Sequence, residues 1–282
     1  MGTEDDALRA RKTWRTVEPL HGMIYFVPEA ASAYERLGIT GRHGYFASRA
    51  APMGAVSADV VVATFFNFNP ELVQAAIPEA WRITTPEALV QARLEGVDGA
   101  MRRLLGDEVV GSTDMDRAAR LARRAAEEAG RHMEGRPLAA GHGALAWPEE
   151  PHLVLWHAQS ILREYRGDGH IALLVSHGLS GIDALITHGA SGEVPSAVLR
   201  STRGWTQEQW DGAVDSMRAR GWLVGGDEPA LSEWGTEQRR EIEDQTDALA
   251  VAPYRALGEA GCHELRTLAR PWSKVFSEVL FR

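Results

Sequence analysis

The stretch that decides the fold spans residues 195–235 and reads PSAVLRSTRGWTQEQWDGAVDSMRARGWLVGGDEPALSEWG. A short helix is predicted over 196–204, between a proline that favours a helix start and a glycine that favours its end. A second helix begins after Thr206, which is an N-capping residue type. Two short apolar runs, 222–224 and 230–232, then flank a glycine turn and predict a hairpin. A long polar helix follows, and this order of elements is that of a winged helix-turn-helix.

The surface that a winged helix presents to DNA has the wrong charge in this sequence. The predicted recognition helix begins with Thr206–Asp211, which holds two acidic residues and no basic one, and the wing tip Gly225–Glu228 is acidic too. Segment 195–245 contains six basic and ten acidic residues, whereas neutralisation of phosphates supplies most non-specific affinity for DNA. We therefore expect no nucleic-acid partner, although Gln207 and Gln209 are of a residue type that reads adenine.

The composition is that of a globular chain outside the membrane. The apolar fraction is 44% and the charged fraction 24%, both ordinary values. The single cysteine, Cys262, excludes an intrachain disulfide and a cysteine-based metal cluster. The start of the chain, MGTEDDALRARK, is acidic where a secretory signal is positive, and no apolar run reaches the roughly 20 residues of a membrane span. We expect a cytoplasmic protein with no membrane association.

Glycine and proline divide the chain near its middle. Residues 134–151, EGRPLAAGHGALAWPEEP, are rich in both and form the best candidate for a domain boundary. We predict an N-terminal helical domain over 1–145 and a winged-helix-like domain with C-terminal helices over 146–282. The predicted fold class is therefore mainly α, with a small β-hairpin as the wing.

Start and stop signals also place helices outside the winged helix. Thr85 followed by proline predicts a helix that ends at Gly106, and Ser112 caps a helix rich in Ala, Arg and Glu that we expect to be exposed. After the boundary, HLVLWHAQSILREYR predicts a strongly apolar helix. Two glycines then interrupt the pattern, and Asp168 is expected to cap a new helix over 170–178.

The most unusual polar sequence is RGDGH, which lies between two apolar runs. Arg163, Arg166 and His170 share a helical face if one helix continues through the glycines. The arginines would bind an anionic group, and Asp168 with His170 would hold or move a proton. The alternative is that Asp168 caps a helix while the arginines pair with carboxylates such as Glu164.

A second polar pair precedes it in the chain. His21 and Tyr25 are four residues apart and share a face if this segment is helical. His21 is a candidate general base and Tyr25 a candidate donor or ligand-binding residue. The alternative is a core histidine whose hydrogen bonds are satisfied by the protein.

A third polar set lies in GRHGYFASRAAPMG, residues 41–54. Arg42, Tyr45 and Arg49 stand there among small residues and glycines that permit close backbone approach. This composition suits a loop lining a ligand pocket, and it equally suits tight packing of helices.

Cofactor signatures are missing from the sequence. The ten histidines form no HExxH or His-x-His pattern, so we predict no metal site. Neither GxGxxG nor a P-loop is present, so we predict no nucleotide cofactor.

Several long motifs resemble a family. EPLHGMIYFVPEA, GYFASRAAPMG, ATFFNFNPELVQAAIPEAW, ILREYRGDGHIA, RGWTQEQW and EIEDQTD are similar to an actinobacterial group of helix-turn-helix-containing proteins of uncharacterised function, some of which occur in natural-product gene clusters. In addition, RARGWLV…LSEWG resembles the pattern of MarR-type winged helices. The resemblance implies a helical part followed by a winged helix, and it supplies no catalytic residue.

Three functions remain open at this point. The leading hypothesis is a small-molecule-binding protein that acts as a cofactor-independent acid/base enzyme of bacterial specialised metabolism and catalyses elimination, cyclisation or hydrolysis. Its ligand would be anionic, with the residues named above facing one another across a pocket. The second hypothesis is a MarR-like, ligand-responsive transcriptional regulator, and the third is a non-catalytic partner subunit or homodimer.

Overall fold

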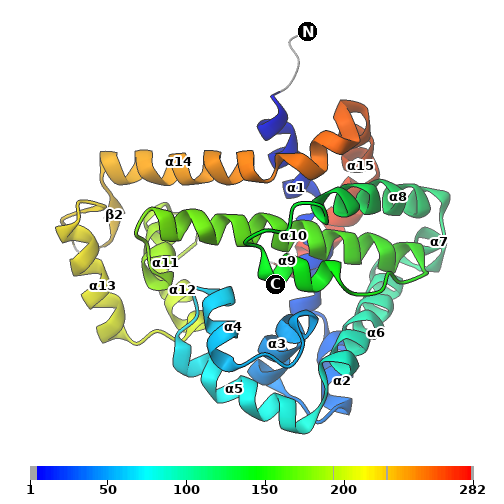
Figure 1. Cartoon of the computed structure of the whole chain (residues 1–282), viewed down its shortest axis with the longest axis horizontal. Helices are drawn as coiled ribbons and strands as arrows, with labels where there is room; N and C mark the ends of the chain where they lie inside the picture. The colour runs from blue at the N-terminus through cyan, green and yellow to red at the C-terminus, as the bar shows by residue number, and fades with distance from the viewer. Residues whose placement is uncertain (1–4, 193, 227, 281–282) are drawn as a thin grey trace. The chain divides into compact units, whose positions relative to one another are not determined.

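The computed structural model describes residues 5–192, 194–226 and 228–280, and most of them lie in helices (Figure 1). The only sheet among these described residues is one two-stranded antiparallel hairpin. The predicted mainly α fold class, with helices and a small hairpin wing, is therefore confirmed. Asp227, at the predicted wing tip, lies outside the described residues.

The chain forms two compact units, each assembled from separate segments. The first comprises residues 1–56, 79–169 and 247–282, and the second comprises 57–78 and 170–246. The boundaries of these compact units differ from those of the predicted domains, 1–145 and 146–282. The domain division stays a prediction.

The first unit is an all-helical assembly. Its elements are α1 (Asp6–Gly22), η1 (Met23–Tyr25), α2 (Pro28–Arg36), α3 (Gly41–Ala50), η2 (Ala51–Met53), α6 (Pro86–Leu105), α7 (Asp107–Val110), α8 (Thr113–Ala129), α9 (Pro137–Gly143), most of α10 (Pro151–Ser176) and α15 (Val251–Leu280). Helix α15 packs along both α1 and α8, and α2 packs along α6. The α2–α6 approach requires Gly96, because a Cβ there would lie 2.7 Å from the Cα of Ala30. The predicted N-caps Thr85 and Ser112 each accept a backbone hydrogen bond.

Helix α8 is not the exposed helix that its composition predicted. Its alanines are buried, and they form the face that packs against α15. Small side chains allow two helices to approach closely, so this Ala-rich sequence indicates a helix–helix interface and not a solvent-exposed helix.

Helix α10 also differs from the prediction. It runs without interruption from Pro151 to Ser176, through both glycines of the RGDGH motif. The expected new helix over 170–178 was therefore wrong. Tertiary packing on both sides of α10 offsets the low helix propensity of two glycines, which costs about 1 kcal/mol each relative to alanine.

The second unit contains the winged helix. Its elements are α4 (Ala58–Phe65), most of α5 (Pro70–Ile83), the end of α10, α11 (Gly181–Ala190), α12 (Ser196–Arg203), α13 (Gln207–Ala219), β1 (Leu223–Val224), β2 (Ala230–Leu231) and most of α14 (Glu233–Leu249). Capping boxes open α11 at Ser180 and α13 at Thr206, and Thr206 is the predicted N-cap. The strands pair with Leu223 opposite Leu231.

A separate apolar core holds this second unit together. It includes Leu185 and Ile186 of α11, Leu199 of α12, and Trp210 and Met217 of α13. Because every helix of the helix-turn-helix contributes to one core, the orientation of α13 is fixed by burial within the unit.

One hydropathy result concerns the long central helix. In the described part of the chain, no single helix has the length and apolar composition to cross a bilayer. Helices α10 and α11 meet these two criteria only when they are taken together, and the pair is bent by 98°.

Candidate functional site

The first unit contains a buried histidine whose two ring nitrogens are both engaged. His21 lies at the end of α1 and is fully buried. Its Nδ1 lies 2.8 Å from Ser160 Oγ, and its Nε2 lies 3.0 Å from Tyr25 Oη. The imidazole stacks on Trp156 with an interplanar angle of 3°. The expected pairing of His21 with Tyr25 on one helical face is therefore present.

The surrounding bonds fix the tautomer of His21. Ser160 Oγ donates its proton to the carbonyl oxygen of Trp156 at 3.0 Å, so it accepts from His21 Nδ1–H. The Nε2 lone pair then accepts the phenolic proton of Tyr25. Burial, with the charge of Arg163 next, holds the pKa of His21 well below its usual range, so the imidazole is neutral at physiological pH. A neutral base therefore stands against a half-buried phenol.

Two arginines converge on one buried carboxylate beside this pair. Arg163 Nη1 lies 2.6 Å from Glu164 Oε1, and Arg49 Nη2 lies 3.4 Å from Glu164 Oε2. Burial alone would raise the pKa of Glu164, but Arg163 and Arg49 outweigh it and lower that pKa to about 2. The glutamate is consequently ionised, and it orders both guanidinium groups.

Tyr25 and Tyr45 contact the two arginines, and Tyr25 also contacts His21. The guanidinium of Arg163 lies 5.9 Å from the ring centroid of Tyr25. The rings of Tyr25 and Tyr45 are 5.2 Å apart, and Arg49 Nη1 lies 3.3 Å from Tyr45 Oη. We call the set His21, Tyr25, Tyr45, Arg49, Arg163 and Glu164 the tyrosine–arginine cluster.

Three other predicted site residues of the first unit lie outside this cluster. Arg166 pairs with Asp247 at 3.0 Å and stacks over Trp14. Asp168 accepts hydrogen bonds from the backbone N–H groups of Leu138 and Ala139, at the start of α9. Arg42 is exposed on α3.

The alternative reading of Asp168 as a helix cap thus describes its contacts, although the helix that it caps is α9. Burial raises the pKa of Asp168 to about 6, against the two backbone donors that lower it. His170 belongs to the second unit, where its Nδ1 lies 2.9 Å from Thr246 Oγ1.

The segment around Arg42, Tyr45 and Arg49 is helix α3 and not a loop. Its Gly44 faces Tyr34, with 3.2 Å between a Cβ at Gly44 and the ring. Tight helix packing, one of the two expectations for this segment, is therefore what the glycine serves.

Sequence reasoning missed Trp156 and Ser160, which contact His21, and named Glu164 only as a possible partner of the arginines. Trp156, Ser160 and Glu164 follow one another at intervals of four along α10. Residues at that spacing share a helical face, so the face that meets His21 was available in the sequence. Because we predicted a helix break at the two glycines, we placed the candidate site around them and not along this face of α10.

The exposed face of α13 in the second unit is acidic where DNA would approach. Gln207 Nε2 donates to Asp211 Oδ1 at 2.7 Å, and Gln209 is engaged in the capping box and with Asn69. Arg218 pairs with Asp215. Both candidate adenine-reading glutamines are thus held by their neighbours.

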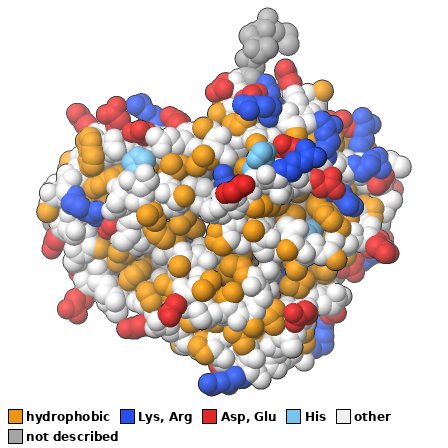
Figure 2. Space-filling view, in the orientation of Figure 1, with side chains coloured by type: hydrophobic (Ala, Val, Ile, Leu, Met, Phe, Trp, Pro, Cys, Tyr) orange, Lys and Arg blue, Asp and Glu red, His pale blue; other side chains and the backbone are white. Residues whose placement is uncertain are grey.

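The charge of the whole second unit agrees with this local picture. Its sequence contains fourteen acidic and six basic residues, so it carries almost all of the chain's net charge of −9. On the face drawn in Figure 2, acidic side chains are interspersed with a few arginines over α13 and the wing. Such a surface repels a phosphate backbone.

Among the residues that the structure describes, no group of three or more His, Cys, Asp or Glu side chains is arranged to hold a metal ion.

The chain therefore combines a helical unit that contains a buried polar cluster with an acidic unit that contains a helix-turn-helix and a hairpin. The family model described as "Helix-turn-helix family" matches residues 10–280, and the chain belongs to this family. No curated protein and no solved structure matches the chain.

Proposed function

We propose that this protein binds a small molecule with an anionic group at the tyrosine–arginine cluster and acts on it by acid/base chemistry without a cofactor. The observation that carries the proposal is the 3.0 Å contact between Tyr25 Oη and the neutral His21 Nε2, beside the guanidinium group of Arg163. The similarity to proteins of natural-product gene clusters makes specialised metabolism the context that we favour.

The chemistry follows from the hydrogen bonds. Tyr25 Oη can take a proton from the substrate while its own proton moves to His21 Nε2 in the same step, so that no separate phenolate forms. Arg163 pairs with Glu18 at 3.3 Å as well as with Glu164, and the N–H groups of Arg163 and Arg49 beside Tyr25 would stabilise the negative charge that develops on the substrate. Elimination, cyclisation and hydrolysis each begin with such a proton transfer. Their common requirement is an anionic substrate that Arg163 holds next to Tyr25.

The first test is retention of a ligand. The purified full chain is dialysed against a small-molecule extract of the producing cells, and the retained compounds are identified by mass spectrometry. We expect the wild type to retain an anionic compound that Arg163→Gln loses. Arg42→Gln is the matched control, because Arg42 is exposed. Equal retention by all three proteins, or none by any, would refute the proposal.

The second test asks whether the retained compound is a substrate. We expect the wild type to convert it, and Tyr25→Phe to bind it while converting it at least about a hundredfold more slowly, the size of a typical general acid–base contribution. Conversion by Tyr25→Phe at the wild-type rate would leave a binding protein and exclude the acid/base role.

Membership of a helix-turn-helix family keeps the regulator as a second candidate. A MarR-like, ligand-responsive regulator would shift its own upstream DNA in an electrophoretic assay at low salt. A partner-subunit or homodimer role, the third candidate, would appear as a stable complex in size-exclusion chromatography and would need no retained ligand.

A further inference from the structure

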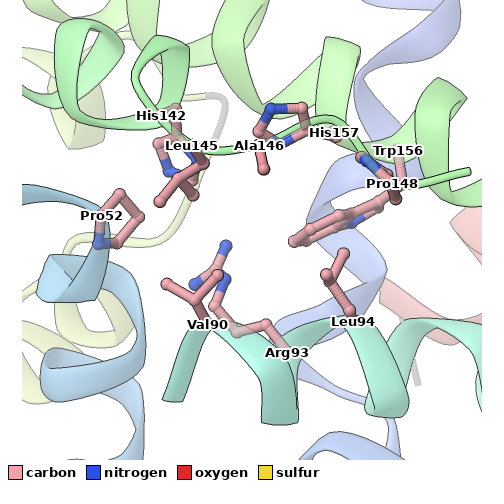
Figure 3. Close-up of a pocket in the computed structure, with 10 residues that line it drawn as sticks. All are labelled: Pro52, Val90, Arg93, Leu94, His142, Leu145, Ala146, Pro148, Trp156 and His157. Carbon is pink, nitrogen blue, oxygen red and sulfur yellow. The ribbon is translucent and has the colours of Figure 1, made fainter. Parts of the chain in front are cut away.

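A second group of buried polar side chains lies in the first unit, apart from the tyrosine–arginine cluster. Arg93 of α6, His142 of α9 and His157 of α10 line one small pocket together with Trp156 (Figure 3). In Figure 3 the guanidinium of Arg93 points into the pocket, toward the side that carries His142 and His157. The half-buried Leu94 and Pro148 contribute an apolar part of its wall.

Arg93 is a buried cation without a carboxylate partner among the described residues. Its side chain is 2% exposed, and Nη1 donates to the carbonyl oxygen of Ser48 at 3.0 Å. The guanidinium carbon lies 5.2 Å from the Trp156 ring centroid, and Nη2 has no hydrogen-bond partner in the described part of the chain. A buried charge of this kind costs several kcal/mol unless a counter-ion pairs with it.

The two histidines share this incomplete bonding. His142 and His157 are 2% and 3% exposed. Within the described residues, neither ring nitrogen of His142 and not Nε2 of His157 has a partner. Burial, followed by the charge of Arg93, lowers the pKa of His142 well below its usual range and that of His157 to about 4. Both rings are therefore neutral at physiological pH, and each has one N–H to donate.

The carboxylate of the neighbouring cluster does not supply the missing charge. Glu164 is held by Arg163 at 2.6 Å and by Arg49 at 3.4 Å. Arg163 also pairs with Glu18, at 3.3 Å. Arg93 has no such carboxylate partner among the described residues, and its buried charge indicates an anionic ligand.

The size of the pocket limits what that ligand is. Its cavity volume is about 20 Å³, which is room for about one water molecule or an atom of similar size. We propose that the pocket is a binding site for a small monovalent anion held between Arg93 and the imidazoles of His142 and His157. The source is a free inorganic ion such as chloride, because the carboxylate of an organic acid has three heavy atoms and exceeds this volume.

The experiment uses the full chain and three probes, chloride, formate and acetate, added at constant ionic strength with gluconate as the balancing anion. Thermal unfolding reports binding, because a ligand of the folded state raises the melting temperature in a saturable way. We expect Arg93→Gln to bind at least about tenfold more weakly, since a charge-assisted hydrogen bond contributes about 1.5–3 kcal/mol. Arg102→Gln, on the same helix and outside the pocket, should bind as the wild type does.

A second measurement on the wild type keeps the proposal testable if Arg93→Gln does not fold. The side-chain NMR resonances of His142 and His157 should shift and saturate with the anion, while the exposed His132 should not. Saturation by chloride supports the proposal, and saturation by formate or acetate alone would contradict it, because a carboxylate exceeds the cavity volume. Shifts that are equal in all three histidines, or an Arg93→Gln variant that responds like the wild type, would overturn the proposal.

Discussion

At the scale of single residues, Glu164 is the buried carboxylate that pairs with both arginines of the tyrosine–arginine cluster. Its side chain is 3% exposed and lies between two guanidinium groups. Removing one partner of such a pair leaves an uncompensated charge in the interior and costs about 3–5 kcal/mol. The cluster is therefore a part of the fold as well as a candidate site.

This burial predicts a specific pH dependence. The folded pKa of Glu164 is lowered to about 2 from an ordinary value near 4.5, so its contribution to stability is complete above that ordinary value and is lost as the pH falls toward about 2. The shift corresponds to about 3 kcal/mol.

We expect Glu164→Gln to be less stable than the wild type at neutral pH, with a difference that shrinks toward about pH 3 as the wild-type carboxylate loses its contribution. Urea unfolding at several pH values measures it. Glu95→Gln, which removes an exposed partner of Arg36, is the control and should change stability by less than about 1 kcal/mol. A Glu164→Gln variant as stable as the control would contradict the buried pair.

His21 gives a second prediction at this scale. Its folded pKa lies well below the usual value, so protonation favours the unfolded chain as the pH falls through that usual value. NMR of the side-chain nitrogens should find His21 neutral and protonated on Nδ1 at about pH 6, where exposed histidines titrate. A charged ring, or a proton on Nε2, would remove the base that Tyr25 requires.

At the scale of elements, α10 supplies Arg163 and Glu164 to the site, and its two glycines have different surroundings. A Cβ at Gly169 would lie 2.6 Å from Arg136 Nη1, whereas one at Gly167 would lie 3.5 Å from Glu164 Oε2, an ordinary contact. Arg136 is held in place because it donates to the carbonyl oxygens of Tyr165 and Leu249.

We predict opposite effects for the two alanine substitutions. Gly169→Ala displaces Arg136 and should cost roughly 1–3 kcal/mol. Gly167→Ala should be neutral or stabilise the protein by up to about 1 kcal/mol through helix propensity. The denaturant midpoints of both variants measure these changes in stability. Equal changes would show that Arg136 does not constrain the turn of α10 around Gly169.

The helix-turn-helix was predictable because its signals are local. Its capping residues, glycine turn and short apolar hairpin lie close together in the sequence, and the predicted N-cap Thr206 does cap α13. The continuity of α10 was not predictable in this way, since packing against distant segments overrides the weak local preference of two glycines. The burial of α8 was missed for the same reason.

Part of the site could be predicted as well. The pairing of His21 with Tyr25 follows from a spacing of four, and the basic residues Arg49 and Arg163 were recognised by type. Their meeting at Glu164 depends on tertiary structure, because α3 and α10 are about a hundred residues apart in sequence. The contacts of Arg93 with Ser48 and Trp156 are equally non-local, so no motif marks that pocket.

At the scale of the whole molecule, charge is divided unevenly between the two compact units. The second unit holds fourteen acidic and six basic residues. We predict that the protein does not bind its own upstream DNA even at low salt, where phosphate contacts are strongest. Fluorescence anisotropy measures this. Salt-dependent, saturable binding would contradict the prediction and favour the regulator.

The most direct test of the central claim is calorimetric titration of the wild type, Arg163→Gln and Arg42→Gln with the compound that the protein retains on dialysis. The account predicts that Arg163→Gln weakens binding at least about tenfold, as expected for the loss of a charge-assisted contact, while the exposed Arg42→Gln leaves it unchanged. Equal affinities in all three proteins would contradict it, because the ligand would then lie away from the tyrosine–arginine cluster.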